Sequence, residues 1–330
     1  MDDVSVSVCI SVHNGERWLR RCLDSVASQD IDALEVVLVD DGSTDGTLQI
    51  MRDYERRHKT VAIKVVEQEN MGLAQGRCTG VRNSTGAYVT FLDCDDYLLD
   101  GAYPTVRRLM RDVEANIYEF RTMREDYYDR SPYSGVMDAR QVLRDYFCGV
   151  GMPVNYWLRW FRRELLPERV FPKDISLHED VYAFPCILHN ARTIAYINEP
   201  LHVHTRDESS IMGRHRALKG TREYFEGRKI LLGTIPHIVS SIGQDVIEHE
   251  YREPFACYVA RTCRDVVFTE AKDVTFDERL GFIGATLGWD APVEEVERLI
   301  VQNLGTERRL NKAIRILGLR NAYRLYKVMR

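Results

Sequence analysis

The sequence lacks long apolar runs. Nowhere in its 330 residues are there about 18 consecutive apolar residues, the length that a membrane-spanning helix requires. The first residues, MDDVSVSVCISVHNG, also lack the basic start and the apolar stretch of a secretory signal peptide. These two absences predict a cytoplasmic protein.

Paired cysteine motifs and a strong positive charge are absent as well. The eight cysteines include no C-x-x-C pair, so we expect free thiols and not a disulfide framework or a zinc site. The formal net charge of −5 gives no overall positive field, and we expect no nucleic acid partner. The composition, 45% hydrophobic and 29% charged, is that of a soluble globular protein long enough for two domains.

The first 120 residues contain an alternation of apolar, β-rich runs with helical patterns. We predict strands at 4–12, 34–40, 61–67 and 87–93, and helices at 16–28, 45–58, 72–84 and 101–114. This order is typical of an α/β fold with a mostly parallel sheet flanked by helices. Each predicted strand ends in polar residues, HNGE, DDGSTDGT, QENMG and DCDD. Because ligands of open sheets bind outside the carboxyl ends of the strands, the four polar ends should meet in one crevice.

The later part of the chain changes character. We predict a strand at 116–123, an exposed loop or hairpin at 124–137, helices at 138–148 and from residue 178, and strands at 193–198 and 201–205. From about residue 214 onward only helical periodicity is present. The sequence therefore predicts an α/β domain at 1–212 and a helical C-terminal region at 213–330.

The stretch VVLVDDGSTDGT places two carboxylates, Asp40 and Asp41, at the end of a predicted strand. A tight turn with a helix cap accounts for the residues that follow, 43–45. It accounts less well for the pair of aspartates, because one carboxylate would be enough for a turn. The alternative is that a carboxylate here accepts a hydrogen bond from a ring N–H of a nucleotide base such as uracil.

The stretch VTFLDCDD has three interpretations. It could be a solvated acidic turn. Asp93 and Asp95, which flank one residue at the end of an apolar strand, could instead hold a hard cation. Mg²⁺ or Mn²⁺ binds one or two carboxylates together with water and substrate phosphates. The third interpretation is the nucleophile loop of a haloacid-dehalogenase-type phosphatase, whose usual Gly-Thr or Thr-Val is missing after the second aspartate.

Four stretches, in this order and spacing, resemble the motifs of glycosyltransferase family 2: VSVCISVHNGERWLRRCLDSVASQ, EVVLVDDGSTDGT, ENMGLAQGRCTGVRNSTGAYVTFLDCDD and HEDVYAFPCIL. The resemblance covers about residues 4–120 and 153–212. It implies a GT-A fold with a nucleotide-binding half at about 1–120 and an acceptor half at about 121–212. It also implies an inverting, metal-dependent enzyme that uses a nucleotide-diphosphate sugar, with a UDP-sugar as the expected donor.

The resemblance assigns roles to residues of the donor site. Asp41 corresponds to the acid that hydrogen-bonds the nucleotide base, and Asp93 and Asp95 correspond to the D-x-D pair that holds Mn²⁺ or Mg²⁺. The other residues expected beside the nucleotide or its diphosphate are Ser11, His13, Asn14, Asn70, Arg77, Arg206 and Ser210.

On the acceptor side, the resemblance assigns catalysis to Glu179 and Asp180. Asp180 corresponds to the base that takes a proton from the acceptor hydroxyl. Its position has a second explanation, because acidic residues also favour the first turn of a helix.

Several positions depart from the family pattern or allow two explanations. Ser11 replaces the usual Pro, His13 replaces the usual aromatic residue, and the A-R-N triplet reads Gly-Arg-Cys at 76–78. The histidines at 202 and 204 could assist a metal, but strand histidines are more often structural. The tryptophans at 157 and 160 could stack on sugars, but a buried aromatic core is the commoner role.

The expected function is transfer of a sugar to a hydroxyl of a glycan or lipid-linked saccharide acceptor, as in cell-surface polysaccharide synthesis. A non-catalytic sugar-nucleotide or glycan-binding relic is the alternative, and the intact set of aspartates argues against it. The stretch 307–330 carries eight basic residues and one acidic residue among apolar residues at helical spacing. It could lie peripherally on the inner face of the membrane or pack on its own chain or a second copy in a homo-oligomer, and packing is the default.

Overall fold

The computed structural model describes residues 5–58, 61–123, 132–150, 154–167, 171, 175, 178–205, 210–287, 297–298, 300–302, 314, 319 and 322–323. The chain forms two compact units. The first comprises Met1–Gln141 and Met152–Asp207, and the second comprises Val142–Gly151 and Glu208–Arg330. The predicted division of the chain between residues 212 and 213 stays a prediction.

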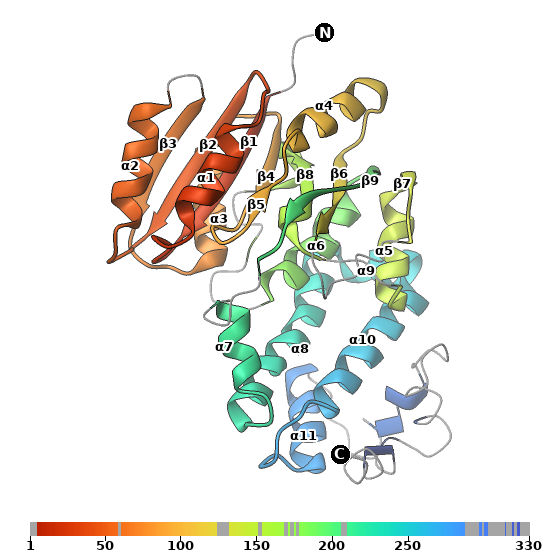
Figure 1. Cartoon of the computed structure of the whole chain (residues 1–330). Helices are drawn as coiled ribbons and strands as arrows, with labels where there is room; N and C mark the ends of the chain where they lie inside the picture. The colour runs from red at the N-terminus through yellow and green to blue at the C-terminus, as the bar shows by residue number, and fades with distance from the viewer. Residues whose placement is uncertain are drawn as a thin grey trace. The chain divides into compact units, whose positions relative to one another are not determined.

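The first unit has the α/β fold that the sequence predicts (Figure 1). Its strands are β1 (Val6–Val12), β2 (Leu34–Asp41), β3 (Ala62–Gln68), β4 (Tyr88–Phe91), β5 (Tyr97–Leu98), β6 (Ile117–Met123), β7 (Gly135–Asp138), β8 (Arg159–Arg162) and β9 (Thr193–Val203). Among the described residues, nine strands form one sheet in the order β3-β2-β1-β4-β8-β6-β9-β5, with β7 paired to β9. The first four strands are parallel, so their carboxyl ends share one edge.

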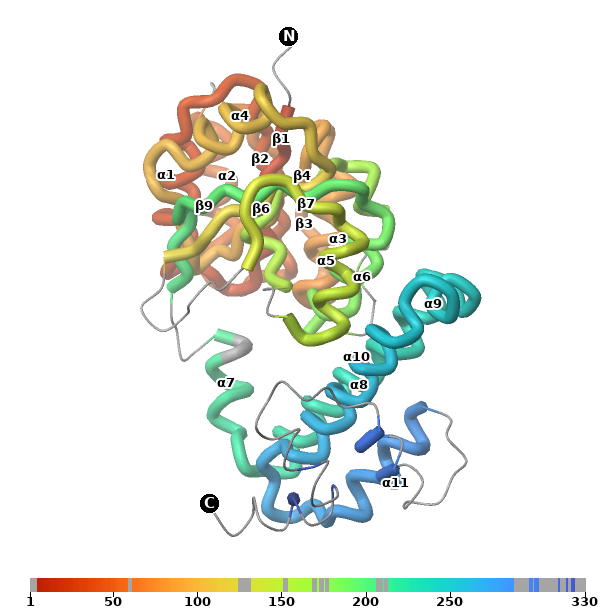
Figure 2. Tube along the Cα trace, turned by 90° about the vertical axis from the view of Figure 1, so that its right-hand side faces the viewer, coloured from red at the N-terminus to blue at the C-terminus, as the bar shows by residue number. Residues whose placement is uncertain are grey.

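Helices cover both faces of this sheet (Figure 2). They are α1 (Leu19–Ala27), α2 (Thr47–Arg57), α3 (Leu73–Asn83), α4 (Ala102–Asp112) and α6 (Glu179–Asn190), with short 3₁₀ turns η1 (Tyr156–Leu158) and η2 (Arg163–Leu165). Successive side chains of a strand point to opposite faces. Val8 and Ile10 of β1 therefore share a buried core with Leu19 and Leu23 of α1 and Ile50 of α2. The other face of β1 is left for α3.

Small residues bring α3 unusually close to β1. A Cβ atom added to Gly76 would lie 1.9 Å from the Oγ of Ser11, and one added to Gly80 would lie 2.9 Å from the Cβ of Cys9. The two glycines are four residues apart and therefore lie on the same face of the helix. This seam holds the first turns of α3 against the carboxyl-terminal half of β1.

The structure corrects several predicted boundaries. Helix α1 begins at Leu19, not at residue 16, because residues 13–16 form a loop with bonds to the next strand end. The two strands predicted at 193–198 and 201–205 are one strand, β9, which continues through Pro200 where its pairing with β6 shifts register. Strand β7 begins within the region predicted as a loop or hairpin and ends one residue beyond it, and residues 124–131 of that region fall outside the described part.

Two short strands, β5 and β8, were not predicted. Strand β8 falls in the aromatic and basic stretch around Trp160, where hydrophobic and polar residues do not alternate regularly. Trp157 is 7% exposed and Trp160 is fully buried, which confirms that these tryptophans belong to the core. The eight cysteines are free thiols, as the sequence predicts.

The second unit is helical, as predicted. Its described helices are α5 (Ala139–Cys148), which belongs to this unit from Val142 onward, α7 (Ile211–Ala217), α8 (Arg222–Ile242), α9 (Gln244–Glu250), α10 (Arg252–Val267) and α11 (Phe276–Leu287). A fully buried arginine, Arg279 of α11, donates hydrogen bonds to the carbonyl oxygens of Val267 (3.1 Å), Thr269 (2.7 Å) and Ala271 (2.9 Å). These carbonyls lie at or just after the end of α10, where unpaired carbonyl groups favour a cation.

The basic stretch 307–330 contributes buried apolar residues wherever its residues are described. These are Ile314, Leu319, Ala322 and Tyr323. The ring of Tyr323 lies 5.8 Å from that of Phe268 and 5.3 Å from that of Phe276. These contacts favour packing of the stretch on its own chain.

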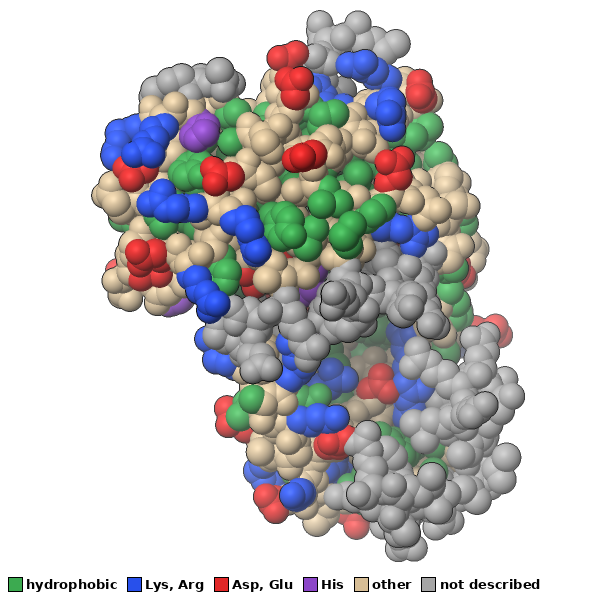
Figure 3. Space-filling model, in the orientation of Figure 1, with side chains coloured by type: hydrophobic (Ala, Val, Ile, Leu, Met, Phe, Trp, Pro, Cys, Tyr) green, Lys and Arg blue, Asp and Glu red, His purple; other side chains and the backbone are tan. Residues whose placement is uncertain are grey.

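The structure shows no helix, within its described ranges, that alone has the length and apolar composition of a membrane span. Helices α8 and α9 together meet those two criteria, with a bend of 95° between them. Basic and acidic side chains are interspersed on the face of the molecule that Figure 3 shows.

Candidate active site

The loops that follow β1 and β2 are bound to each other. The Oδ1 of Asn14 accepts a hydrogen bond from the backbone N–H of Thr44 (2.8 Å), and the Oδ2 of Asp45 accepts one from the N–H of Glu16 (3.1 Å). The other carboxylate oxygen of Asp45 accepts from the N–H of Thr47 (3.0 Å), so Asp45 also binds the first N–H group of α2. Two of the predicted polar strand ends therefore form one structure.

Asp41 binds the end of β3 to the end of β2. Its carboxylate is buried and accepts hydrogen bonds from the side chain of Gln68 (2.7 Å) and from the N–H groups of Met71 (2.8 Å) and Gly72 (2.9 Å). A carboxylate has about four acceptor positions, so capacity remains for a ligand N–H. The neighbouring Asp40 is also buried, and its Oδ1 has no hydrogen bond.

His13 lies exposed at the end of β1, with its ring held by polar neighbours. Its Nδ1 lies 2.9 Å from the carbonyl oxygen of Asp41, and because a carbonyl only accepts, Nδ1 carries the hydrogen. The Nε2 is then an acceptor and lies 3.2 Å from the side-chain nitrogen of Asn14, while the side-chain nitrogen of Asn70 lies 3.1 Å from Nδ1 and 3.3 Å from Nε2. Three of the residues expected beside the nucleotide are thus in direct contact. Ser11 is less exposed and packs under the backbone of α3.

The D-x-D residues follow β4 and have different surroundings. Asp93 is partly exposed and accepts a hydrogen bond from Arg77 (2.8 Å). Burial, reinforced by the carboxylates of Asp93 and Asp96, raises the pKa of Asp95 to about 7. A cation at Asp95 would offset this repulsion.

Arg77 joins the D-x-D loop to the start of α6. Its guanidinium is buried and forms ion pairs with Asp93 and with Glu179, which is 102 residues further along the chain. It lies 6.0 Å from the ring centre of Phe91 and 5.6 Å from that of Tyr156. Burial alone would lower the pKa of Arg77, but Asp93 and Glu179 outweigh it and hold the pKa above its usual value. Arg77 is therefore a fixed positive charge between two groups of carboxylates.

Asp180 occupies the first turn of α6, next to Glu179. The residue before the helix, His178, has a left-handed backbone (φ 63°), which marks a sharp turn into the helix. Burial raises the pKa of Asp180 to about 7, the charge of Glu179 adds to the effect, and Arg77 opposes it. A carboxyl with this pKa can gain or lose a proton near neutral pH.

The described part of the first unit does not include two of the predicted site residues. Arg206 lies outside the described residues. Ser210 belongs to the second unit, where its hydroxyl caps α7 by accepting from the N–H of Gly213 (3.0 Å).

The structure adds two residues, Asp96 and Arg21, for which the sequence predicted no role at the site. Asp96 lies beside His202 and His204, and Arg21 of α1 donates to the backbone oxygen of Asp95 (2.7 Å). For Asp96 and the two histidines the sequence held a usable signal: a third aspartate directly follows the D-x-D stretch, and two histidines at H-x-H spacing occur later in the chain. Nothing in the local sequence distinguishes Arg21 from its exposed neighbours.

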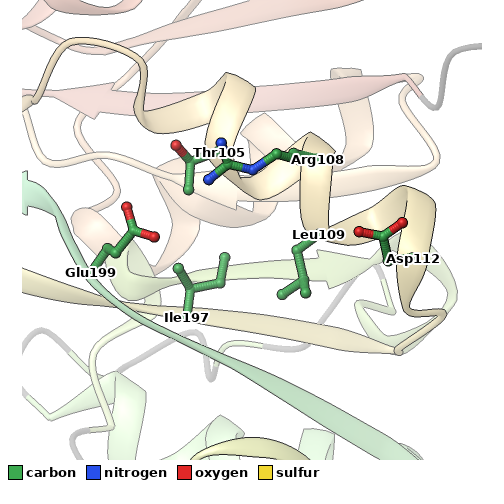
Figure 4. A pocket seen from close by; sticks show the side chains of 6 residues that line it. All are labelled: Thr105, Arg108, Leu109, Asp112, Ile197 and Glu199. Atoms are coloured by element: carbon green, nitrogen blue, oxygen red, sulfur yellow. The ribbon is translucent and has the colours of Figure 1, made fainter.

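A pocket lies elsewhere in the first unit, between α4 and β9 (Figure 4). It is lined by Thr105, Arg108, Leu109, Asp112, Ile197 and Glu199. None of these residues belongs to the polar strand ends.

The donor set at the strand ends suits a hard cation. Within the described ranges, no three His, Cys, Asp or Glu side chains form a group that could hold a metal ion. Two carboxylates, Asp93 and Asp95, remain, and Mg²⁺ or Mn²⁺ is commonly held by one or two carboxylates while substrate phosphates and water complete its coordination. The raised pKa of Asp95 fits a position where positive charge is wanted.

The sheet order, the two helical layers and the acidic loop after β4 define a GT-A fold. The fragment 1–349 of TarS from S. aureus, solved in complex with UDP-GlcNAc, superposes with a TM-score of 0.70 at 20% identity, covering 99% of this chain and 91% of that chain. The mannosyltransferase PcManGT from Pyrobaculum calidifontis, solved with GDP-Man and Mn²⁺, gives a TM-score of 0.52 at 19% identity and covers 99% of this chain and 86% of that chain.

Residues 7–168 match the profile of glycosyl transferase family 2, and this part of the chain belongs to that family. Similar proteins include the glycosyltransferase GlyA of Streptococcus pneumoniae, 30% identical over 63% of this chain and 32% of GlyA. The glycosyltransferase EpsJ of Bacillus subtilis is 26% identical over 62% of this chain and 62% of its own length. The chain thus spans about a third of the first relative and less than two thirds of the second. Family membership leaves the phosphatase interpretation of VTFLDCDD without support.

Proposed function

We propose that this chain is an inverting glycosyltransferase that moves a sugar from a nucleotide-diphosphate donor to a hydroxyl of a glycan or lipid-linked saccharide. The observation that carries the proposal is the shared ion pairing of Arg77. It joins Asp93 of the D-x-D pair (2.8 Å) to Glu179, the neighbour of Asp180. Family membership supports the assignment of these two groups to the donor and the acceptor.

In this proposal each residue has one chemical task. Asp180 accepts the proton of the acceptor hydroxyl while the oxygen of that hydroxyl forms a bond to the anomeric carbon, from the side opposite the departing diphosphate. The bond from the anomeric carbon to the phosphate oxygen breaks at the same time, and the nucleoside diphosphate leaves with the electron pair. Asp93 and Asp95 would hold a divalent cation, which when bound offsets the charge growing on the diphosphate. Arg77 holds Asp93, of the D-x-D pair, and Glu179, beside Asp180, in fixed positions.

UDP is the nucleotide to test first. TarS was solved with UDP-GlcNAc, and PcManGT was solved with GDP-Man and Mn²⁺, so related folds take more than one nucleotide. In this chain the base would lie beside the ring of His13, with a remaining acceptor position of Asp41 available for a ring N–H. The proposed role in cell-surface polysaccharide synthesis rests on the resemblance to the family.

The test is a calorimetric or thermal-shift titration of UDP, GDP, CDP and dTDP, each with and without Mn²⁺. We expect one nucleotide to stabilise the wild type more strongly when Mn²⁺ is present. Asp95→Ala should abolish this metal dependence, and Asp100→Ala, an exposed aspartate nearby, is the matched control. If no nucleotide stabilises the wild type under any condition, the donor site is absent and the proposal fails.

Asp180→Asn separates an enzyme from a non-catalytic relic of the same fold. The amide cannot accept the proton, so we expect normal nucleotide binding together with loss of sugar transfer. Transfer by Asp180→Asn at the wild-type rate would exclude Asp180 as the base. Nucleotide binding by a wild type that transfers no sugar to any saccharide acceptor would favour the relic.

We further propose that the protein acts in the cytoplasm. A peripheral position on the inner face of the membrane would bring lipid-linked acceptors within its reach. The burial of the described apolar residues of stretch 307–330 favours packing over insertion of that stretch. Sedimentation with anionic liposomes, with and without residues 308–330, tests the membrane contact. Equal sedimentation of both forms would rule out this stretch as the anchor.

A further inference from the structure

The third aspartate of the acidic loop, Asp96, is fully buried and bound to the end of β9. Its Oδ1 accepts a hydrogen bond from the backbone N–H of Thr205 (2.8 Å). Its Oδ2 lies 3.0 Å from the Nδ1 of His204 and 3.3 Å from the Nε2 of His202. The loop that carries Asp93 and Asp95 is therefore fastened from its buried side.

The same loop is fastened from its exposed side by Arg21. The guanidinium of this α1 residue donates to the backbone oxygen of Asp95 (2.7 Å) and to the hydroxyl of Thr205 (2.9 Å). It lies over the ring of Tyr97, 4.6 Å from the ring centre. Asp96 and Arg21 thus connect the same two segments, the acidic loop and residues 204–205.

The two histidines are both held by other protein groups. The Nδ1 of His202 lies 3.1 Å from the hydroxyl of Thr122, so both of its ring nitrogens face protein groups. Both rings stack on the buried Trp157, with centres 4.4 Å and 5.1 Å from it. Strand β5, which follows the acidic loop directly, pairs with the same end of β9.

We propose that Arg21, His202 and His204 are positioning residues that fix the D-x-D loop against the end of β9, through the backbone of Asp95 and the carboxylate of Asp96. This inference rests on the proposed function, because it assigns these residues to the support of the predicted cation site. Residues that orient ligands in this way commonly change metal affinity by about 10- to 100-fold when they are altered.

The test measures binding of Mn²⁺ in the presence of UDP, and binding of UDP alone, by calorimetry. Arg21→Met keeps an apolar stem over Tyr97 and removes both hydrogen bonds. Because Arg21 is exposed, this variant should fold. We expect its affinity for Mn²⁺ to fall about tenfold, with the melting temperature nearly unchanged. Arg20→Met, the same change at the preceding exposed residue of α1, should bind as the wild type does.

Asp96→Asn tests the buried side. The amide oxygen can still accept from Thr205, but the negative charge beside the two histidines is lost. We expect weaker Mn²⁺ binding and faster hydrogen exchange at the backbone amide of Thr205. Tyr88→Phe removes a buried hydrogen bond to Ala115 (2.7 Å) at the other end of β4, and should lower stability without changing Mn²⁺ affinity.

The outcomes separate the two levels of the proposal. A wild type without metal-dependent UDP binding would overturn the proposed function, and this inference with it. A wild type that binds Mn²⁺ and UDP, together with Arg21→Met and Asp96→Asn variants that bind equally well, would overturn this inference alone. If Asp96→Asn does not fold, the Arg21→Met result decides.

Discussion

At the scale of single residues, Arg77 shows that a residue of the site can act by binding other protein groups, and not the ligand itself. The family resemblance assigns it to the nucleotide and diphosphate, whereas its two η nitrogens pair with Asp93 and Glu179 in this structure. A buried arginine with two carboxylates is costly to disrupt, because removal of one partner leaves an uncompensated charge. The charges around Asp180 are thereby fixed, which sets the proton affinity of that carboxyl.

Asp180 gives a pH prediction. Its pKa is raised to about 7 by burial and by Glu179, and only the ionised carboxylate can accept a proton. As pH falls below about 7 the carboxyl becomes protonated, so kcat/KM should fall by about tenfold per pH unit. A pH profile of kcat/KM at saturating Mn²⁺ measures this fall at low pH, which forms the acidic limb of the profile. A profile that is flat from about pH 5 to about pH 8, a range that spans the pKa of about 7 of Asp180, would contradict the assignment.

Glu179→Gln tests the cause of the raised pKa. The neutral amide oxygen can still accept from Arg77, but the negative charge that raises the pKa of Asp180 is gone. The acidic limb should therefore move to lower pH. Glu164→Gln, at an exposed position in η2, should leave the limb in place.

At the scale of elements, the contact of α3 with β1 depends on two departures from the family pattern. Gly76 replaces the usual alanine, and Ser11 replaces the usual proline. The two residues meet, since a Cβ on Gly76 would lie 1.9 Å from the Oγ of Ser11. The sequence showed each departure separately, and only the structure relates one to the other.

Gly76→Ala should therefore destabilise the protein, although alanine is normally the better helix residue. Forcing an extra carbon into a packed contact costs about 1–3 kcal/mol, measured as the free energy of unfolding in urea. Ser11→Ala in the same chain should recover part of the loss, because it removes the nearest atom. Gly281→Ala in α11, where a Cβ would have open space, should stabilise by about 0.5–1 kcal/mol. Equal effects at both glycines would disprove the close contact.

The elements also show which local patterns are informative. The first four strands and the helices between them were predictable, because the alternation of apolar runs with amphipathic helices is carried by neighbouring residues. Strands β5 and β8 were missed because one has only two residues and the other lies in a stretch whose aromatic residues are buried whatever their secondary structure. The break predicted inside β9 was wrong, because pairing with β6 adjusts around Pro200.

At the scale of the whole molecule, Arg279 and the predicted donor residues at the strand ends belong to different compact units. Arg279→Met would leave several buried carbonyl groups after α10 without a donor. We expect a loss of about 3 kcal/mol in the free energy of unfolding of the helical unit. The UDP affinity of the folded protein should be unchanged at about 20 °C.

Arg252→Met, an exposed change in the same unit, should alter neither property. Thermal unfolding followed by calorimetry and UDP titration measure the two quantities separately. Loss of UDP binding by folded Arg279→Met would show that the helical unit supports the donor site.

The sequence by itself determined the alternation that builds the sheet, the family, and the polar residues at each strand end, because each of these is written in neighbouring residues. Only the tertiary structure decided how those residues share contacts. Arg77 meets Glu179 across 102 positions, and Asp96 meets His204 across 108. The raised pKa values of Asp95 and Asp180 follow from burial and from the charges so assembled. Such pairings depend on how helices and strands pack, which no local pattern specifies.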